Sequence, residues 1–317
     1  MIMSNYNAPE FSTSLLTPKY WPVWFGFGLL ALLVNLFPYS LLYKTGRGLG
    51  ILGMKFGKKR AHITRRNLEL AFPEKTEQEI ETLTTENFKN TGLALIETAI
   101  AWFWPDWRFR RLIISHDTSQ LESLEEQGKG VLLCCVHALN LEITARAFTV
   151  VGKPGYGIYR PHNNPAYNFI QHWGRTRTGN QLIDRKDLKG MIRVLRRGNR
   201  LWYLPDQDYG RRKSVFVPFF AVKDACTTTG TSILAYTSKS AMVTGSSFRN
   251  AQGKYELIVS EDIQPDYPQK DEKAAAAFMN KQMEQVILRA PEQWMWLHKR
   301  FKTMEDPSIP MGSRYKQ

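Results

Sequence analysis

The stretch VLLCCVHALNLE, residues Val131–Glu142, determines how we interpret the rest of the chain. Its first six residues are all apolar, which is typical of a short strand buried on both faces of a sheet. The following residues, from Leu141 to Phe148, have a helical pattern, so we expect a strand, a short turn and a helix. His137 then lies at the carboxyl end of the strand, which is where α/β sheets place their sites.

His137 and Glu142 form a candidate catalytic pair with the spacing His-x4-acid. Residues five apart on a continuous helix are separated by about 140°, so a direct contact between them requires the turn inferred above. In that turn the carboxylate can orient the imidazole while the histidine takes a proton from an attacking hydroxyl. The alternative is a structural histidine, hydrogen-bonded at the end of the strand, and a glutamate exposed to solvent. The spacing alone does not exclude this alternative.

The segments on either side alternate between helical and strand patterns. Two or three helices are expected between residues 61 and 107. The later segments are a helix at 188–197 that ends at Gly198, strands at 201–204, 241–248 and 255–259, and a helix at 271–288. This order predicts an α/β fold with a mixed central sheet flanked by helices, in a single domain that covers residues 44–317.

The N-terminal segment, residues 1–43, is expected to anchor the protein in a membrane. Tyr20–Tyr43 contains no charged residue, has aromatic residues at both ends and is long enough to span a bilayer. Pro22 and Pro38 weaken a straight span, so a helix that lies in the membrane interface, or a buried core helix, remains an alternative. A basic block from Lys44 to Arg66 follows, and the positive-inside rule places it, and the catalytic domain after it, in the cytoplasm.

Composition narrows the class of partner. The chain has 43 Lys and Arg against 29 Asp and Glu, a formal charge of +14, so its partners should be anionic: nucleic acid, anionic lipid, a phosphorylated substrate or an acidic protein. Cys134 and Cys135 are neighbours and point to opposite faces of a strand, which does not suit a disulfide framework. The cysteine pattern is therefore best explained by a protein that resides in a reducing compartment. A hydrophobic content of 43% is ordinary for a globular enzyme and argues against disorder.

Nine short sequence motifs are distributed along nearly the whole chain. They are Phe11–Thr13, Pro18–Trp21, Arg66–Leu70, Ala101–Pro105, Tyr159–Pro161, Asp184–Met191, Pro205–Gly210, Thr227–Thr231 and Met295–Lys302. With these motifs and the His137–Glu142 spacing, the sequence resembles the late acyltransferases of lipid A biosynthesis, within the lysophospholipid acyltransferase superfamily. Glu142, where the myristoyltransferases commonly have Asp, makes it more similar to the lauroyltransferase branch.

The resemblance implies an activity and a location. A late acyltransferase moves a fatty acyl group, here lauroyl or a similar chain, from acyl carrier protein to the hydroxyl of an acyl chain on the Kdo-bearing tetraacylated lipid A precursor. This step of lipopolysaccharide or lipooligosaccharide biosynthesis takes place at the inner membrane of Gram-negative bacteria. The thioester donor is already activated, so hydroxyl deprotonation and oxyanion stabilisation suffice and no cofactor is expected. The sequence also has no metal-ligand spacing and no Gly-rich nucleotide loop.

The same resemblance implies roles for individual residues. His137 would be the general base and Glu142 the carboxylate that orients it. Arg160 would bind an anionic or polar part of a substrate, since a guanidinium suits phosphate, although an ordinary surface ion pair is an alternative. Asp206 and Asp208 would bind a basic partner or a sugar hydroxyl, although aspartates that shape a turn beside a glycine are equally plausible.

Three further positions carry open alternatives. Arg185 and Lys186 would contact substrate phosphates or the acidic carrier protein, but a solvated helix face is an equal alternative. Gln207 stands where the family is expected to have a histidine, which puts an acid–base role at that position in doubt.

Two other functions compete with this one. A glycerolipid acyltransferase of the same superfamily would share the His-x4-acid motif but should carry a different phosphate-binding block in place of Asp206–Gly210. A basic membrane-tethered protein that binds nucleic acid or lipid headgroups is the non-enzymatic alternative. Such a protein has no need of His137, Glu142 and Arg160 together, so we expect membrane lipids but no nucleic acid as partners.

Overall fold

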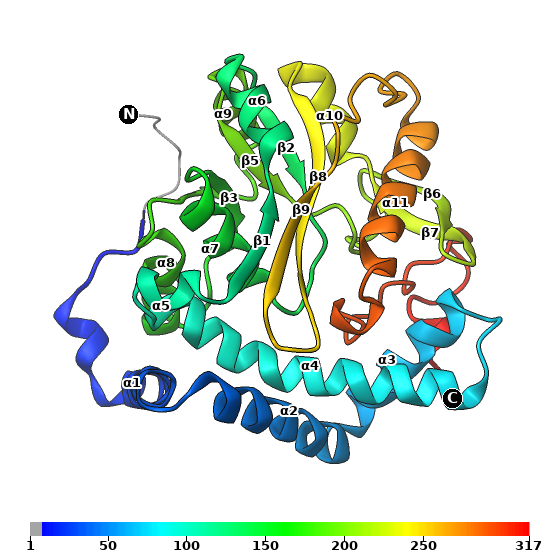
Figure 1. Ribbon diagram of the computed structural model, residues 1–317. Coiled ribbons are helices and arrows are strands. Elements are labelled where there is room, and N and C mark those ends of the chain that lie inside the picture. The colour runs from blue at the N-terminus through cyan, green and yellow to red at the C-terminus, as the bar shows by residue number, and fades with distance from the viewer. Residues whose placement is uncertain (1–7, 317) are drawn as a thin grey trace.

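The computed structural model describes residues 8–316 (Figure 1). A seven-stranded sheet in the order β1-β9-β8-β2-β5-β3-β4 forms its centre, and β6 and β7 form a separate two-stranded sheet. The strands are β1 (Ile113–Asp117), β2 (Val131–Cys134), β3 (Tyr156–Tyr159), β4 (Gln181–Asp184), β5 (Arg200–Tyr203), β6 (Ser214–Phe219), β7 (Val222–Thr228), β8 (Ala241–Arg249) and β9 (Tyr255–Val259).

Helices cover both faces of the central sheet, and a further helical layer runs across one end of its strands (Figure 1). The α-helices are α1 (Trp21–Leu36), α2 (Tyr39–Phe56), α3 (Lys58–Ala71), α4 (Glu77–Phe103), α5 (Asp106–Arg110), α6 (Ser119–Glu126), α7 (Leu141–Val151), α8 (Pro165–Thr176), α9 (Leu188–Arg196), α10 (Gly230–Ser238) and α11 (Glu272–Leu288). Short 3-10 helices are η1 (Thr13–Leu16), η2 (Pro18–Tyr20), η3 (Pro291–Gln293) and η4 (Ser313–Tyr315). The α/β fold with a mixed sheet is confirmed, because β9 pairs antiparallel with β8 whereas the other neighbours are parallel.

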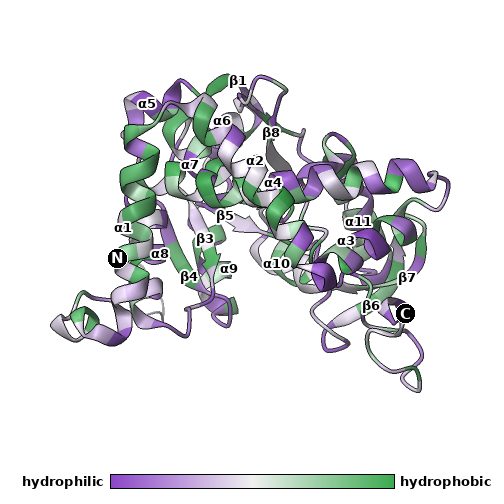
Figure 2. Ribbon diagram, turned by 90° about the horizontal axis from the view of Figure 1, so that it is seen from below, coloured by the Kyte–Doolittle hydropathy of each residue, from purple (hydrophilic) through white to green (hydrophobic). Residues whose placement is uncertain are grey.

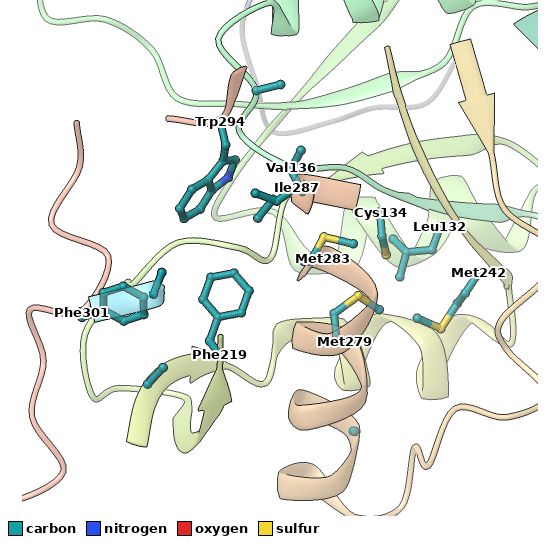
Figure 3. Packing of buried hydrophobic residues seen from close by; sticks show 14 of the residues in the cluster. Leu132, Cys134, Val136, Phe219, Met242, Met279, Met283, Ile287, Trp294 and Phe301 are labelled. Carbon is teal, nitrogen blue, oxygen red and sulfur yellow. The ribbon is translucent and has the colours of Figure 1, made fainter. Parts of the chain in front are cut away.

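Strand β2 organises the core because both of its faces are covered. Leu132 and Cys134 belong to one buried cluster, which includes Met279 and Met283 of α11 (Figure 3). Val131 and Leu133 belong to the cluster on the other face, which α4, α6 and α7 complete. Alternate residues of a strand point to opposite faces, so only a wholly apolar run can satisfy both clusters.

The topology brings the carboxyl ends of the parallel strands to one edge of the sheet. β2 pairs with both β5 and β8, and β5 and β4 pair with β3, all in parallel. The helical layer of α4, α1 and α2 runs along that edge (Figure 1). The Tyr39 hydroxyl at the start of α2 donates to the Gly253 carbonyl in the turn after β8, at 2.7 Å. Residues that follow β2, β3, β4 and β5 therefore lie near this layer.

The N-terminal segment differs from the single anchor predicted over residues 20–43. It is broken near Pro38, which has no N–H for a continuing helix, and forms α1 and α2 instead. Pro18–Leu36 is still long and apolar enough to cross a membrane by length and composition. The predicted boundary between residues 43 and 44 falls inside α2.

Helix α2 packs tightly on α4 through glycines. A Cβ added at Gly50 would lie 2.0 Å from the Phe88 carbonyl oxygen, and one added at Gly92 would lie 2.1 Å from the Gly50 nitrogen. Gly46 contacts the backbone of Leu93 in the same way. The two helices therefore touch backbone to backbone, which fixes α2 against the rest of the protein.

Candidate active site

His137 and Asp206 form the most constrained polar pair at the carboxyl edge of the sheet. His137 follows β2 and Asp206 follows β5, the strand paired with it. The two side chains meet with 2.6 Å between His137 Nδ1 and Asp206 Oδ1. The His137 main-chain N–H and the Trp294 indole N–H both donate to Asp206 Oδ2, at 2.7 and 2.6 Å.

The electrostatics of this pair suit an ionised aspartate. Burial of the Asp206 carboxyl opposes ionisation, but the interaction with His137 and the three hydrogen bonds outweigh it, so the pKa of Asp206 is lowered. The His137 side chain keeps 25% of its surface exposed, whereas that of Asp206 has none. Within residues 8–316, Nε2 of His137 has no hydrogen-bond partner, so the imidazole is held at one nitrogen and open at the other.

Glu142 has different partners from those predicted for it. It lies in the first turn of α7, where the Trp102 indole N–H donates to Oε2 at 2.9 Å and Arg175 Nε donates to Oε1 at 2.9 Å. The described part of the chain has no hydrogen bond between Glu142 and His137. The prediction that Glu142 orients His137 is therefore corrected. The hydrogen-bond partner of His137 Nδ1 is Asp206, and the side chain of Glu142 points from α7 toward α4 and α8.

Two residues that the sequence did not single out, Trp102 and Arg175, hold Glu142. The Trp102 ring packs on the α8 backbone, since a Cβ added at Gly174 would lie 2.4 Å from it. It also stacks on Phe27 of α1, with ring centroids 5.7 Å apart. Arg146 of α7 donates to the carbonyls of the last turn of α4, which fixes the position of Trp102 relative to Glu142. No short spacing in the sequence connects these residues.

A cavity begins at the Glu142–Arg175 pair. It comprises about 540 Å³ of space between the atoms, part of which is open solvent. Apart from Glu142, Arg175 and Asn180, its walls are apolar or lack a side chain. These wall residues are Leu141, Ala145, Gly157, Ile158, Leu182, Trp202 and Leu204. The cavity thus combines one ion pair and one amide with walls that are otherwise apolar.

Arg160, Arg185 and Lys186 are exposed at the same edge of the sheet. Tyr159 and Asp184 are partners in the β3–β4 ladder, and the Arg185 N–H donates to the Tyr159 carbonyl at 3.0 Å. The backbones of Arg160 and Arg185, which directly follow the two strands, are therefore close together. None of the three cations has an ion pair within the described residues. This arrangement leaves a basic surface that is free to bind an anionic group, and substrate binding by these three residues stays a prediction.

The structure does not bring Asp208 into the open part of the site. Its side chain has no exposed surface, and its carboxylate accepts from Thr303 and from the Gly210 N–H. Gly210 has a positive φ of 89°, so the turn favours glycine there. Of the two predicted alternatives, a basic partner or a sugar hydroxyl, the structure gives each carboxylate a basic partner within the protein: His137 for Asp206, and Lys302, at 4.0 Å, for Asp208. Both carboxylates are buried, and Asp208 shapes the loop.

Gln207, between these aspartates, is also buried. Its Nε2 has no hydrogen-bond partner in the part of the chain that the structure describes. Among the same residues there is no cluster of three or more potential metal ligands.

The structure combines a histidine held by a buried aspartate, exposed cations at the carboxyl edge of a mostly parallel sheet, and a largely apolar cavity. This combination defines an α/β enzyme suited to an apolar substrate that carries negative charge. Comparison with known proteins makes this specific. The profile of the family described as bacterial lipid A biosynthesis acyltransferase matches residues 8–303. The chain belongs to this family, and the protein is therefore an acyltransferase of lipid A biosynthesis.

Three relatives from Escherichia coli K12 mark its place in the family. The chain is 48% identical to the lipid A biosynthesis lauroyltransferase, over 98% of this chain and 99% of the relative. It is 42% identical to the palmitoleoyltransferase, over 93% of this chain and 95% of the relative. Identity to the myristoyltransferase is 29%, over 95% of this chain and 93% of the relative. The similarity to the lauroyltransferase branch predicted from Glu142 agrees with this order.

Proposed function

We propose that the protein transfers a lauroyl or similar chain from acyl carrier protein to a hydroxyl of the Kdo-bearing tetraacylated lipid A precursor, at the cytoplasmic side of the inner membrane. The observation that carries the proposal is the His137–Asp206 pair, with Nε2 of the histidine open. An imidazole whose Nδ1–H donates to a carboxylate presents Nε2 as a base.

The proton steps follow from this tautomer. His137 Nε2 removes the proton from the acceptor hydroxyl as its oxygen attacks the thioester carbonyl. Asp206 stabilises the imidazolium that forms, and the proton then passes from Nε2 to the leaving thiolate of the carrier. An ester forms, a thioester breaks, and neither metal nor cofactor is required.

The cavity and its mouth provide binding. Its apolar walls suit an acyl chain, and Glu142 and Arg175 are the charged residues that line it. In the proposal Arg175 stabilises the oxyanion that develops on the thioester carbonyl, and Glu142 holds Arg175 in place. Glu142 thus remains part of the catalytic site through Arg175 instead of through His137.

The exposed cations suit the anionic partners. Arg160, Arg185 and Lys186 would bind phosphates of the acceptor or the acidic surface of the carrier protein. Because Arg160 and Arg185 are adjacent, they can grip one phosphate together. These three residues would bind substrate and take no part in proton transfer, since none of them contacts His137 in the described residues.

The experiment is mass spectrometry of lipid A from cells that lack the gene and carry either the wild type or a variant. Wild type should add the mass of one acyl chain, and its position and length define the reaction. His137→Ala should abolish the addition, and His116→Ala, an exposed histidine on β1, should leave it intact. Addition of the same chain by folded His137→Ala would refute the proposal.

A further inference from the structure

The outer sides of α1 and α2 expose a continuous set of large apolar side chains. We call this set the lipid face. Its members are Trp21, Phe25, Leu29, Leu32 and Leu36 on α1, and Leu41, Leu49, Leu52 and Phe56 on α2. Phe25 is 70% exposed and Phe56 is 77% exposed, which is unusual for such residues unless a partner covers them. Seen from below, both helices lie flat in one face of the protein (Figure 2).

The opposite side of α1 is attached to the catalytic body along its length. Trp24 packs on Phe169 of α8, and Phe27 packs on Trp102 and on Tyr167 of α8. Further along, the Trp104 indole N–H donates to the Val34 carbonyl at 2.7 Å. Both ends and the middle of α1 are thus held by α4, α8 and the loop after α4.

This packing is incompatible with an α1 that crosses the bilayer. Were α1 upright, the elements packed against it would have to enter the hydrocarbon with it. These include α5 with Asp106, Arg108 and Arg110, and Arg108 itself donates to the Asn35 and Phe37 carbonyls at the end of α1. Charged groups at that depth carry a large penalty. A helix lying in the plane of the interface leaves them in water.

The charge around the lipid face points to an anionic surface. From Phe11 to Leu68 the chain has nine Lys and Arg and no Asp or Glu. Lys44, Lys55, Lys58 and Lys59 are exposed and have no ion pair within residues 8–316. Lysines beside an apolar helical stripe are the combination that binds anionic leaflets.

We propose that the protein is monotopic: α1 and α2 both lie in one leaflet that contains anionic lipids, with the lipid face down, and neither helix spans the membrane. The carboxyl edge of the central sheet lies toward this helical layer (Figure 1). The proposal does not rest on the catalytic roles above, because it uses only the outer surface and the packing of α1.

Thiol labelling of sealed vesicles tests the topology directly. The native cysteines are buried, so an introduced cysteine is the only one that a membrane-impermeant maleimide should reach. Ser12→Cys precedes α1, and Lys129→Cys lies in an exposed turn before β2. In a monotopic protein both variants are labelled in inside-out vesicles and both are protected in right-side-out spheroplasts. Labelling of Ser12→Cys only in spheroplasts would show a spanning α1 and overturn the proposal.

Vesicle flotation tests whether anionic lipid covers the lipid face. Full-length protein should float with phosphatidylcholine vesicles that contain phosphatidylglycerol, and less with phosphatidylcholine alone. Leu29→Glu with Leu52→Glu should weaken binding by about tenfold or more, whereas Tyr236→Glu, an exposed aromatic on α10 at the far side, should not (Figure 1). Circular dichroism checks that each variant is folded. Unchanged flotation of the folded double variant, or a face buried in a stable dimer, would refute lipid as the occupant.

Discussion

Replacing Asp206 by Asn should separate the geometry of the His137 pair from its charge. Two N–H donors, from His137 and Trp294, point at Oδ2, so the amide oxygen of an asparagine must occupy that place. Its NH2 group then faces Nδ1 and can only donate to it. The histidine proton is consequently driven to Nε2, the nitrogen that must accept the proton of the attacking hydroxyl.

The size of the effect follows from the lost charge. For charges about 4 Å apart at an effective dielectric constant of about 20, the imidazolium loses about 4 kcal/mol of stabilisation. That corresponds to about a 10³-fold lower kcat, and the unfavourable tautomer extends the expected loss to roughly 10³–10⁴-fold. Initial rates of acyl transfer with purified protein in detergent would measure it. A folded Asp206→Asn variant within about tenfold of wild type would refute the reasoning.

Asp208→Asn is the matched control, because Asp208 is equally buried but shapes a loop. It should lower the free energy of unfolding while kcat of the folded protein changes little. The two variants should also differ in acid. Because the pKa of Asp206 is lowered on folding, its ionised form stabilises the protein above the pKa of the unfolded chain, and this stability is lost as pH falls through the folded pKa. Denaturation at several pH values should show this loss in wild type and its absence in Asp206→Asn.

Variants at three further residues test the rest of the site. Glu142→Gln should lower kcat while leaving the pH dependence set by His137 in place; a shift of that pH dependence would instead favour direct orientation of His137 by Glu142. Trp102→Phe removes a hydrogen bond to a carboxylate and should lower the free energy of unfolding by about 1–3 kcal/mol in a denaturant titration; no change would argue against a stabilising bond. Arg160→Ala should raise the KM for the acceptor with kcat less affected, and Arg160→Lys should restore little if the grip is bidentate; an unchanged KM for Arg160→Ala at low and high salt would exclude the role.

The sequence identified His137 correctly as a strand-end residue because the apolar run before it has a single physical solution. A run that can face two apolar clusters must be a central strand, and a polar residue directly after it must lie at the carboxyl edge. The same reasoning could not assign the partner of His137. Asp206 is 69 positions away and reaches Nδ1 only because β5 pairs with β2, and strand order is a property of the whole sheet.

The five-residue spacing between His137 and Glu142 led to the wrong hydrogen-bond partner for a related reason. Five residues allow a contact with His137, but the direction in which α7 leaves the turn decides whether it forms. That direction depends on long-range contacts, such as Leu139 N–H with the Gln293 carbonyl and the grip of Arg146 on α4. The break at Pro38 was visible in the sequence, but the docking of α1 on α8 was not, since apolar residues cover α1 all round.

Helix α4 connects the catalytic site to the lipid face, and this connection gives the N-terminal helices a structural role in the site. Phe27 of α1 stacks on Trp102, and Trp102 donates to Glu142, which lines the cavity. Nearer the start of α4, the glycine contacts hold α2 against its backbone. Removal of α1 should therefore impair the site itself as well as membrane binding, because it takes away one of the two surfaces that position Trp102.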